Sequence, residues 1–415
     1  MSIGTDERVA AERAAPRGSD EERQARSCGT GSVCFVSTGP PMLRLLTGEG
    51  PDAMGGAELQ LSLLSNYLRS NGWGVTFLVG DYGQQSEIVT EDGTRAIKAY
   101  PREGEEKTPG GALRDANRLW RSLAEVDADV YVCRGLTGQA GVVAAWCKSY
   151  DRPYVFWFAK NVDALYGIPW ISSLPVAERL PAAMGIGSAD AVILQTDEQG
   201  ELLERHFSRP GVLIRNAFPV EEQPHRAQDG GYVLWIGSIQ PKKRPEMLLE
   251  IAAWLPDVQF VMAGGPLKNY PDYYKRVRRE LSKLPNVDYR GFVPYEETPA
   301  LFREASLLLS TSDPLEEGFP NIFLQAWAAG VPVASTCDPD EVISRNEIGC
   351  RFRSAADGID KIRDLMQAPQ ERERLAERAR RYVDEHHSIE QMGRRFEDVL
   401  ASLLEETSLP VNETW

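Results

Sequence analysis

The sequence predicts an α/β protein built from two doubly wound domains with parallel sheets. Short apolar runs typical of buried parallel strands alternate with helical segments along most of the chain. A polar stretch without periodicity, residues 221–231, separates two such alternating halves. With 415 residues, the chain is also too long for one ordinary hydrophobic core. Two domains are therefore expected.

The first half opens with a strand, a glycine-rich loop at 48–56, a helix and a second strand, which together start a doubly wound domain. The helix has one apolar face formed by leucines at helical spacing. Over this half we expect strands at 32–38, 75–79, 95–100, 128–133, 154–158, 191–194 and 212–214, and helices at 57–70, 111–126, 138–148 and 198–207.

The second half repeats the alternation. It opens on the buried strand 232–237, and its last segment has the pattern of an amphipathic helix. Over this half we expect strands at 232–237, 258–263, 287–289, 305–309 and 331–334, and helices at 246–255, 273–284, 322–329, 371–385 and 389–406.

These elements place the domain boundaries. The N-terminal residues are rich in Arg, Glu, Ala and Ser and have no apolar core, so we expect a tail rather than a secretory signal. The expected organisation is a disordered tail at 1–31, a first domain at 32–214, a connecting segment at 215–231, a second domain at 232–386, and a C-terminal helix with a tail at 387–415.

Charge and composition exclude several classes of protein. The formal net charge of −15 argues against nucleic-acid binding and against a polybasic membrane anchor. No apolar run approaches the ~20 residues that a membrane-spanning helix needs. The six cysteines form no Cys-x-x-Cys pair and are expected to be reduced thiols. We expect a cytoplasmic protein, and peripheral contact with a membrane stays open.

The segment from Glu316 to Val333 is the most informative part of the chain. It begins with two carboxylates, and Asn321 is expected to cap the buried helix that follows. A helix N-terminus suits a phosphate group, because its backbone N–H groups are unpaired. The carboxylates would repel phosphates unless they faced a neutral polyhydroxylated group such as a sugar. Gln325 lies one turn after Asn321 and can face the same cleft.

This segment resembles the signature of the retaining glycosyltransferases of family 4, also called group 1, which have the GT-B fold of two Rossmann-like domains separated by a deep cleft. The segment 215–219 resembles the family's hinge between the domains, and the last helix, within 387–415, resembles the one that returns to the first domain. The family motif is Glu, seven residues, Glu, around Gly-Phe-Pro-Asn and Ala-Ala-Gly-Val-Pro-Val. Glu317 matches the first Glu, and Gln325 stands in place of the second. The resemblance implies that Glu317 contacts donor-sugar hydroxyls and Gln325 holds the ribose. It also implies donor contacts from four neighbours, Gly318, Phe319, Asn321 and Ile322. The plain alternative is that the two carboxylates only complement the helix dipole.

Three further loops resemble the family's nucleotide-binding loops. After the strand that ends at Gly237, the family has an arginine and, five positions later, a lysine that hold the donor diphosphate. Lys243 matches the lysine, Ser238 replaces the arginine, and Lys242 or Arg244 is expected to supply the missing charge. A solvated basic turn is the alternative. The resemblance also implies that Gly265 and Val293 bracket the base through their backbone, and that Gly55 and Gly56 approach the donor phosphates or the acceptor.

The acceptor side carries a weaker signal. Many family members place a histidine after one of the first-domain strands, and this sequence has none from residue 1 to 205. Polar residues at the expected strand ends include Arg134, Lys160 and Asp163, which are candidates for the acceptor cleft because ligands of open α/β sheets bind at the carboxyl ends of strands. An ordinary ion pair between Arg134 and Asp163 is an equal alternative.

No metal or cofactor is expected. Asp127-Ala128-Asp129 matches the Asp-x-Asp metal motif of another glycosyltransferase fold, but it precedes a strand instead of following one. The lysine beside the diphosphate would supply the charge that a metal supplies elsewhere. The expected donor is a nucleotide-diphosphate sugar, with UDP as the expected nucleotide.

The resemblance implies a retaining transferase of hexosyl type that moves a sugar from a nucleotide sugar to an acceptor. Small molecules, glycans and lipids are all possible acceptors, and the sequence determines neither the sugar nor the oligomeric state. A nucleotide-sugar epimerase of the same fold is one alternative, although the shortage of histidines counts against its acid–base chemistry. A catalytically silent nucleotide-sugar-binding subunit is another, because Ser238 and Gln325 depart from the motif.

Overall fold

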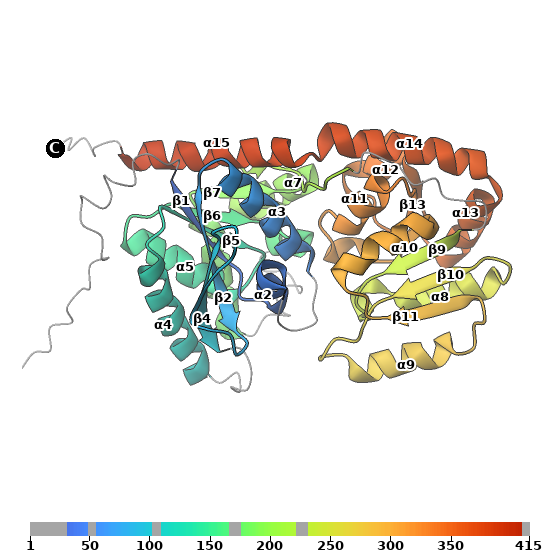
Figure 1. Cartoon of the computed structure of the whole chain (residues 1–415), viewed down its shortest axis with the longest axis horizontal. Coiled ribbons are helices and arrows are strands. Elements are labelled where there is room, and N and C mark those ends of the chain that lie inside the picture. Colours follow the sequence, from blue (N-terminus) through green and yellow to red (C-terminus); the bar gives the residue numbers. More distant parts are fainter. Residues whose placement is uncertain (1–30, 49–54, 102–108, 166–175, 221–230, 409–415) are drawn as a thin grey trace, which may run out of the picture.

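The computed structural model describes residues 31–48, 55–101, 109–165, 176–220 and 231–408. They form two α/β domains side by side, with two long C-terminal helices running along one side of both (Figure 1). The predicted tails and most of the linker lie outside the described residues. None of the described helices is both long and apolar enough to span a bilayer.

The first domain contains an eight-stranded sheet in the order β3-β4-β2-β1-β5-β6-β7-β8. All neighbouring strands are parallel except β3 and β4. The strands are β1 Ser32–Val36, β2 Gly74–Asp81, β3 Glu87–Val89, β4 Arg95–Pro101, β5 Val130–Arg134, β6 Tyr154–Trp157, β7 Ala191–Leu194 and β8 Val212–Leu213.

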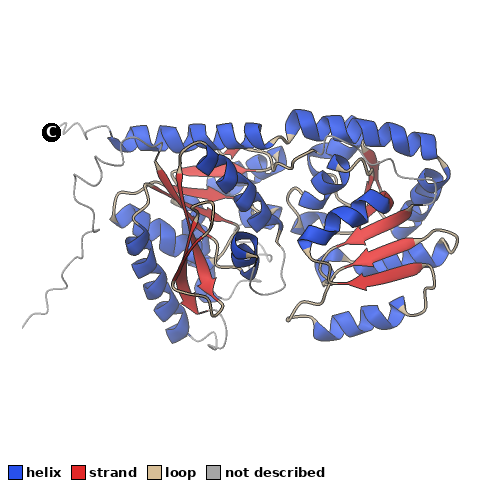
Figure 2. Cartoon of the chain, viewed as in Figure 1, coloured by secondary structure: helices blue, strands red, loops and turns tan. Residues whose placement is uncertain are grey.

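Helices cover both faces of this sheet (Figure 2). They are α2 Pro40–Thr47, α3 Gly56–Ser70, α4 Pro109–Val126, α5 Gly138–Ser149, α6 Val176–Gly187 and α7 Asp197–Phe207. The predicted helices and the seven predicted strands are confirmed to within a few residues. The sequence did not predict α2, α6 or the short antiparallel β3. The local signal for α2 is the proline at its first position, because a proline there needs no hydrogen-bond partner for a backbone N–H.

The second domain contains a fully parallel six-stranded sheet in the order β11-β10-β9-β12-β13-β14. Its strands are β9 Tyr232–Ile236, β10 Phe260–Ala263, β11 Val287–Gly291, β12 Ala305–Ser310, β13 Val333–Ser335 and β14 Gly349–Arg351. Its helices are α8 Pro245–Trp254, α9 Pro271–Leu281, α10 Thr298–Glu304, α11 Asn321–Ala328, α12 Val342–Asn346, α13 Ala355–Gln367 and α14 Pro369–His386. The sequence predicted all of these except α10, α12, α13 and β14.

The last helix, α15 Ile389–Ser408, returns to the first domain as predicted. Its inward face buries Met392, Phe396 and Leu400 in the core of that domain. A Cβ on Gly393 would lie only 2.2 Å from the Tyr67 ring, so glycine is needed for α15 to pack this closely on α3. The two domains are therefore joined twice, by the hinge after β8 and by the step from α14 to α15.

Candidate active site

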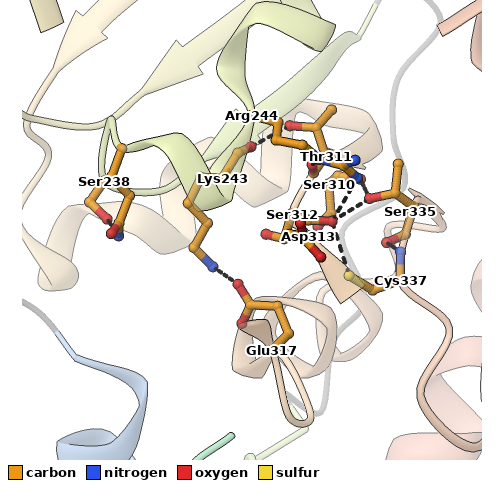
Figure 3. A network of polar contacts seen from close by, with 12 residues as sticks. Ser238, Lys243, Arg244, Ser310, Thr311, Ser312, Asp313, Glu317, Ser335 and Cys337 are labelled. Atoms are coloured by element: carbon orange, nitrogen blue, oxygen red, sulfur yellow. Dashed lines mark hydrogen bonds and ion pairs between the residues drawn. The ribbon is translucent and has the colours of Figure 1, made fainter. Parts of the chain in front are cut away.

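A lysine and a glutamate meet at the carboxyl ends of two neighbouring strands of the second sheet. Lys243 lies in the short turn Pro241–Lys243 after β9, and Glu317 follows the turn Pro314–Glu316 after β12. The Lys243 ammonium forms an ion pair with the Glu317 carboxylate (Figure 3). Their side chains keep 23% and 14% of their surface exposed, so both groups can still reach a ligand.

The charge of Glu317 is set by opposing effects. Burial raises the pKa of its carboxyl group, but the charges of Lys243 and Lys242, with hydrogen bonds from Lys243 and Ser312, outweigh burial and lower that pKa below its ordinary value. Glu317 is therefore a carboxylate at neutral pH. A carboxylate of this kind accepts hydrogen bonds but does not supply a proton.

Arg244 does not replace the arginine that the family has at the position of Ser238. Its Nε donates to the Thr311 carbonyl at 2.8 Å, and its Nη2 donates to the Ser312 carbonyl at 3.0 Å (Figure 3). The arginine thus anchors the loop after β12. Ser238 accepts a hydrogen bond from Gln240 at 2.6 Å within its own loop. Of the two cations that the sequence left open, Lys242 is the one available to the site.

The prediction that Asn321 caps α11 is wrong. Pro320 holds the cap position, no side chain caps the helix, and Asn321 is its first residue. The Asn321 amide instead crosses to the first domain, where its Nδ2 donates to the Gly56 carbonyl at 2.7 Å. Its Oδ1 accepts from Asn216 at 2.9 Å and from Gln60 at 3.1 Å. Asn321 therefore holds the start of α11 against the start of α3 in the first domain.

Asn216 in the hinge is the centre of this contact, a role that the sequence did not reveal. Its Nδ2 donates to Gln195 at 2.8 Å as well as to Asn321, and its Oδ1 accepts from Arg134 at 2.8 Å. Its carbonyl accepts a hydrogen bond from Nδ1 of the buried His387 at 2.6 Å. The one available signal was the family resemblance of the segment Arg215–Pro219.

The other signature residues fall into two groups. Gln325 and Ile322 are half-buried on α11, and Gln325 lies one turn after Asn321 as predicted. Phe319 is only 4% exposed and packs against Trp327, so its backbone alone can meet a ligand. Gly318 is needed for a close approach of the domains, because a Cβ there would lie 3.0 Å from the Ala159 carbonyl.

The loops of Gly237, Gly265 and Val293 follow strands of the second sheet, on the same edge as Lys243. Gly237 directly follows β9, and a Cβ on it would lie 4.0 Å from the Lys243 side chain. The Gly265 carbonyl accepts from Ile239 at 2.9 Å, and Val293 is half-buried two residues after β11. In the first domain, Gly55 precedes α3. These residues stay candidates for ligand contacts through their backbone.

Asp163, one of the three acceptor candidates, is engaged within its own loop. Asp163 is completely buried, and its carboxylate accepts from the backbone N–H groups of Ala159 at 2.8 Å, Lys160 at 3.1 Å and Leu136 at 3.3 Å. It therefore shapes its own loop and does not line the acceptor cleft, which corrects the prediction.

Arg134 belongs to the hinge. Its guanidinium lies 3.7 Å from the Trp157 ring centre and donates to Asn216, while burial lowers its pKa to about 9. Among the ion pairs of the described residues, none joins Arg134 to Asp163, so the simple alternative is also wrong. Lys160 remains the acceptor-side candidate, and it lies next to the donor side. The backbone N–H of its neighbour Asn161 donates to the Glu317 carbonyl at 3.2 Å.

The Asp-x-Asp segment is occupied by structural contacts. Asp127 pairs with Arg152 at 2.6 Å, and Asp129 accepts from the backbone N–H and hydroxyl of Ser32 at 2.8 and 2.7 Å. In the part of the chain that the structure describes, no cluster of three His, Cys, Asp or Glu residues could hold a metal ion. A polar cavity of about 550 Å³ does exist, but it lies beside Lys148, Asp190 and the end of α15, away from Glu317.

Two family models match the chain, one for each domain. The first, described as Glycosyl transferase 4-like domain, matches residues 55–217, and the second, described as Glycosyl transferases group 1, matches residues 219–382. The chain belongs to the group 1 glycosyltransferases. The family resemblance predicted from the Glu316–Val333 segment is therefore confirmed.

Curated relatives of this group 1 glycosyltransferase include two named D-inositol 3-phosphate glycosyltransferase. The relative from Mycobacterium leprae (strain TN) is 28% identical over 211 residues, which cover 45% of this chain and 49% of the relative. The relative from Streptomyces avermitilis is 27% identical over 300 residues, which cover 59% of this chain and 64% of the relative. The chain thus spans about half the length of the first of these relatives.

Solved structures share the whole architecture. Sucrose-phosphate synthase from Thermosynechococcus elongatus superposes with a TM-score of 0.74 at 15% identity, covering 91% of this chain and 100% of that chain. Anabaena HepE in complex with UDP-glucose superposes with a TM-score of 0.69 at 17% identity, covering 90% and 100%. At these identities the likeness establishes the fold, and the predicted GT-B arrangement of two Rossmann-like domains is confirmed.

Proposed function

We propose that this protein transfers a hexosyl group from a nucleotide-diphosphate sugar to an acceptor hydroxyl, with retention of the anomeric configuration. The observation that carries the proposal is the pair of Lys243 and Glu317, partly exposed at the carboxyl ends of β9 and β12. Ligands of open α/β sheets bind at this edge. The pair offers a cation for a phosphate and a carboxylate for sugar hydroxyls.

In the proposed reaction the bond from the anomeric carbon to the diphosphate oxygen breaks, and the diphosphate leaves with the electron pair. The acceptor hydroxyl forms the new bond and releases its proton to the leaving phosphate or to water. Negative charge grows on the diphosphate, and Lys243 is placed to stabilise it. Glu317 orients the sugar, Gln325 binds the ribose through its amide, and the backbone at Gly265 and Val293 contacts the base.

A UDP-sugar is the donor we propose, since one structural neighbour was solved with UDP-glucose. The names of the relatives make D-inositol 3-phosphate the first acceptor to try. We also propose that the transfer needs no metal ion, because lysines supply the positive charge. Dialysis against EDTA should then leave the rate unchanged, and a loss that Mg²⁺ restores would contradict this part.

The decisive experiment begins with a thermal-shift screen of UDP, GDP, dTDP and ADP and their common sugars. A bound ligand stabilises the fold by ~2.7 kcal/mol at a hundred times its dissociation constant. Lys243→Ala should weaken binding of the preferred diphosphate by about tenfold or more, the loss expected for one hydrogen bond to a charged group. Unchanged binding would refute the role of Lys243.

Turnover then separates the proposal from its alternatives. Donor consumption only in the presence of an acceptor supports a transferase, and the anomeric proton coupling in the NMR spectrum of the product tests retention. Conversion of the donor sugar without an acceptor would indicate an epimerase. Tight donor binding without any turnover would indicate a silent binding subunit.

A further inference from the structure

The turn that carries Lys243 and the loop that leads to Glu317 are joined by hydrogen bonds in addition to their ion pair. Thr311 directly follows β12, and its hydroxyl donates to the Lys243 carbonyl at 2.7 Å. The same hydroxyl accepts a hydrogen bond from the Trp235 indole at 2.9 Å. Thr311 is only 1% exposed, so water does not compete for these bonds. The backbone of Lys243 is therefore fixed from within the protein core.

Arg244 makes the reverse connection, from the turn to the loop. Its guanidinium donates to the Thr311 and Ser312 carbonyls at 2.8 and 3.0 Å (Figure 3). The Asp313 N–H in turn donates to the Lys242 carbonyl at 2.8 Å. We call these bonds, together with the bond that the Thr311 hydroxyl donates to the turn, the clasp. The clasp holds the turn after β9 and the loop after β12 in one fixed arrangement.

The backbone conformation of Arg244 needs this support. Its φ of 43° and ψ of 53° lie in the left-handed region, which is unfavourable for a residue with a Cβ. The next residue is Pro245, and a residue before proline normally prefers an extended conformation. Such strain persists only where the surrounding structure holds it, and it is concentrated at functional sites. The clasp supplies the contacts that hold the turn in this conformation.

The ion pair cannot maintain the arrangement by itself once a donor binds. A diphosphate competes with Glu317 for the Lys243 ammonium, because both partners are anions. None of the bonds of the clasp uses the ammonium or the carboxylate. They join backbone carbonyls to a buried hydroxyl, a guanidinium and a backbone N–H. The clasp can therefore stay intact while the ammonium turns from the carboxylate to a phosphate.

We propose that Arg244 and Thr311 are positioning residues, which keep the Lys243 ammonium and the Glu317 carboxylate in place before and during the transfer. In this role neither residue touches the donor. A charged group that is already aligned stabilises the growing charge of the leaving group without reorganisation. The inference rests on the proposed function, because the clasp serves catalysis only if Lys243 and Glu317 act on a donor sugar.

The first test measures kcat and the donor KM of the full chain with the preferred donor. Thr311→Val removes the hydroxyl and keeps the shape. We expect kcat to fall about tenfold or more with a smaller change in KM, since a misplacement of ~1 Å can cost about a hundredfold in rate. Thr311→Ser keeps the hydroxyl and should retain most of the rate.

Thr298→Val is the matched control for this test. Thr298 is also buried, and its hydroxyl also donates to a backbone carbonyl, that of Tyr295 at 2.7 Å, but it lies at the start of α10. This variant should lose stability as Thr311→Val does and keep the original kcat. An equal loss of kcat in the two variants would overturn the inference, because a general loss of stability would then explain both.

The second test separates the side chain of Arg244 from the strain in its backbone. Glycine adopts a positive φ without penalty, so Arg244→Gly should melt at a higher temperature than Arg244→Ala, while kcat falls in both. Arg372→Ala is the control, because Arg372 on α14 also donates to two carbonyls, those of Leu365 and Met366, and its loss should leave kcat unchanged. Normal kcat in Arg244→Gly would overturn the positioning role of Arg244.

A double-mutant cycle shows whether Thr311 acts through Lys243. Thr311→Val should have little further effect on kcat in a Lys243→Ala background, and full additivity would overturn the inference. Normal kcat in Thr311→Val, with Lys243→Ala still impaired, would also overturn it and leave the proposed function standing. Normal kcat in Lys243→Ala, or no turnover by the unaltered protein, would defeat the proposed function and this inference together.

Discussion

The two sheets have the same strand order around their first strands, but the polar side chains at the carboxyl ends of their strands make different contacts. We call these two sides of the sheets the first edge and the second edge. In each sheet the first strand of the domain lies between the second strand and a strand from later in the chain, in the orders β2-β1-β5 and β10-β9-β12. At the second edge, Lys243 and Glu317 pair and stay partly exposed. At the first edge, Asp163 is buried and Arg134 is tied to Asn216.

The comparison teaches that a fold supplies a place for a ligand but does not make every polar residue there available. Three backbone N–H groups donate to the Asp163 carboxylate. Arg134 stacks on the Trp157 ring and donates from Nη2 to Asn216, while its buried Nε and Nη1 have no hydrogen-bond partner among the described residues. At the first edge Arg134 therefore binds the hinge residue Asn216, whereas at the second edge Lys243 and Glu317 stay partly exposed to a ligand. Lys160 is the exception, since it follows β6 on the first edge while its backbone lies against Gly318 of the second domain.

The largest expected effect is on the transfer rate, when the Glu317 carboxylate at the second edge is removed. Glu317→Ala should lower the transfer rate at least ~100-fold, the scale of one well-placed polar contact in a transition state. Glu316→Ala, which removes the neighbouring carboxylate, is the control and should retain most activity. Steady-state rates with the preferred donor measure both variants. Near-normal turnover in Glu317→Ala would show that the second edge is not the reacting site.

The matching change at the first edge should affect stability more than chemistry. Asn216→Ala removes the partner of Arg134, Gln195 and Asn321 and leaves buried polar groups unpaired. We expect a loss of about 2 kcal/mol or more in the free energy of unfolding, measured by urea denaturation. The exposed Asn66→Ala is the control. Equal stability of the two variants would mean that Asn216 does not hold the hinge.

A smaller, pH-dependent effect should come from His387. Burial lowers the pKa of its ring to about 3 from the ordinary 6.5, so the unfolded chain binds a proton that the folded chain does not. Stability from this group is complete above pH 6.5 and falls as the pH drops toward 3. Within that window the slope is about 1.4 kcal/mol per pH unit.

The measurement compares unfolding free energies between pH 7 and pH 5. His387→Asn can still donate to the Asn216 carbonyl through its amide but does not titrate, so it should lose this part of the slope. His206→Asn, on α7, is the control that should keep it. The same slope in the original protein and in His387→Asn would mean that the hinge histidine is not the group that titrates.

Much of the second edge could be predicted from the sequence, because its residues lie within two short loops. The resemblance of these two loops to the family's motifs was enough to select Glu317 and Lys243 for the site. The role of Asn321 was predicted wrongly, because a polar residue at a helix start resembles a cap until its partners are known. Those partners, Gly56, Gln60 and Asn216, lie 105 or more residues away.

The sequence by itself determined the alternation of strands and helices, the two domains and the signature segment, since these depend on periodicity and on near neighbours in the chain. Only the tertiary structure decided which charged groups are occupied and which are free. Arg134 meets Asn216 across 82 residues, and Lys243 meets Glu317 across 74. A local pattern carries no information on such partners, because their distances are set by how the sheets and the hinge pack together.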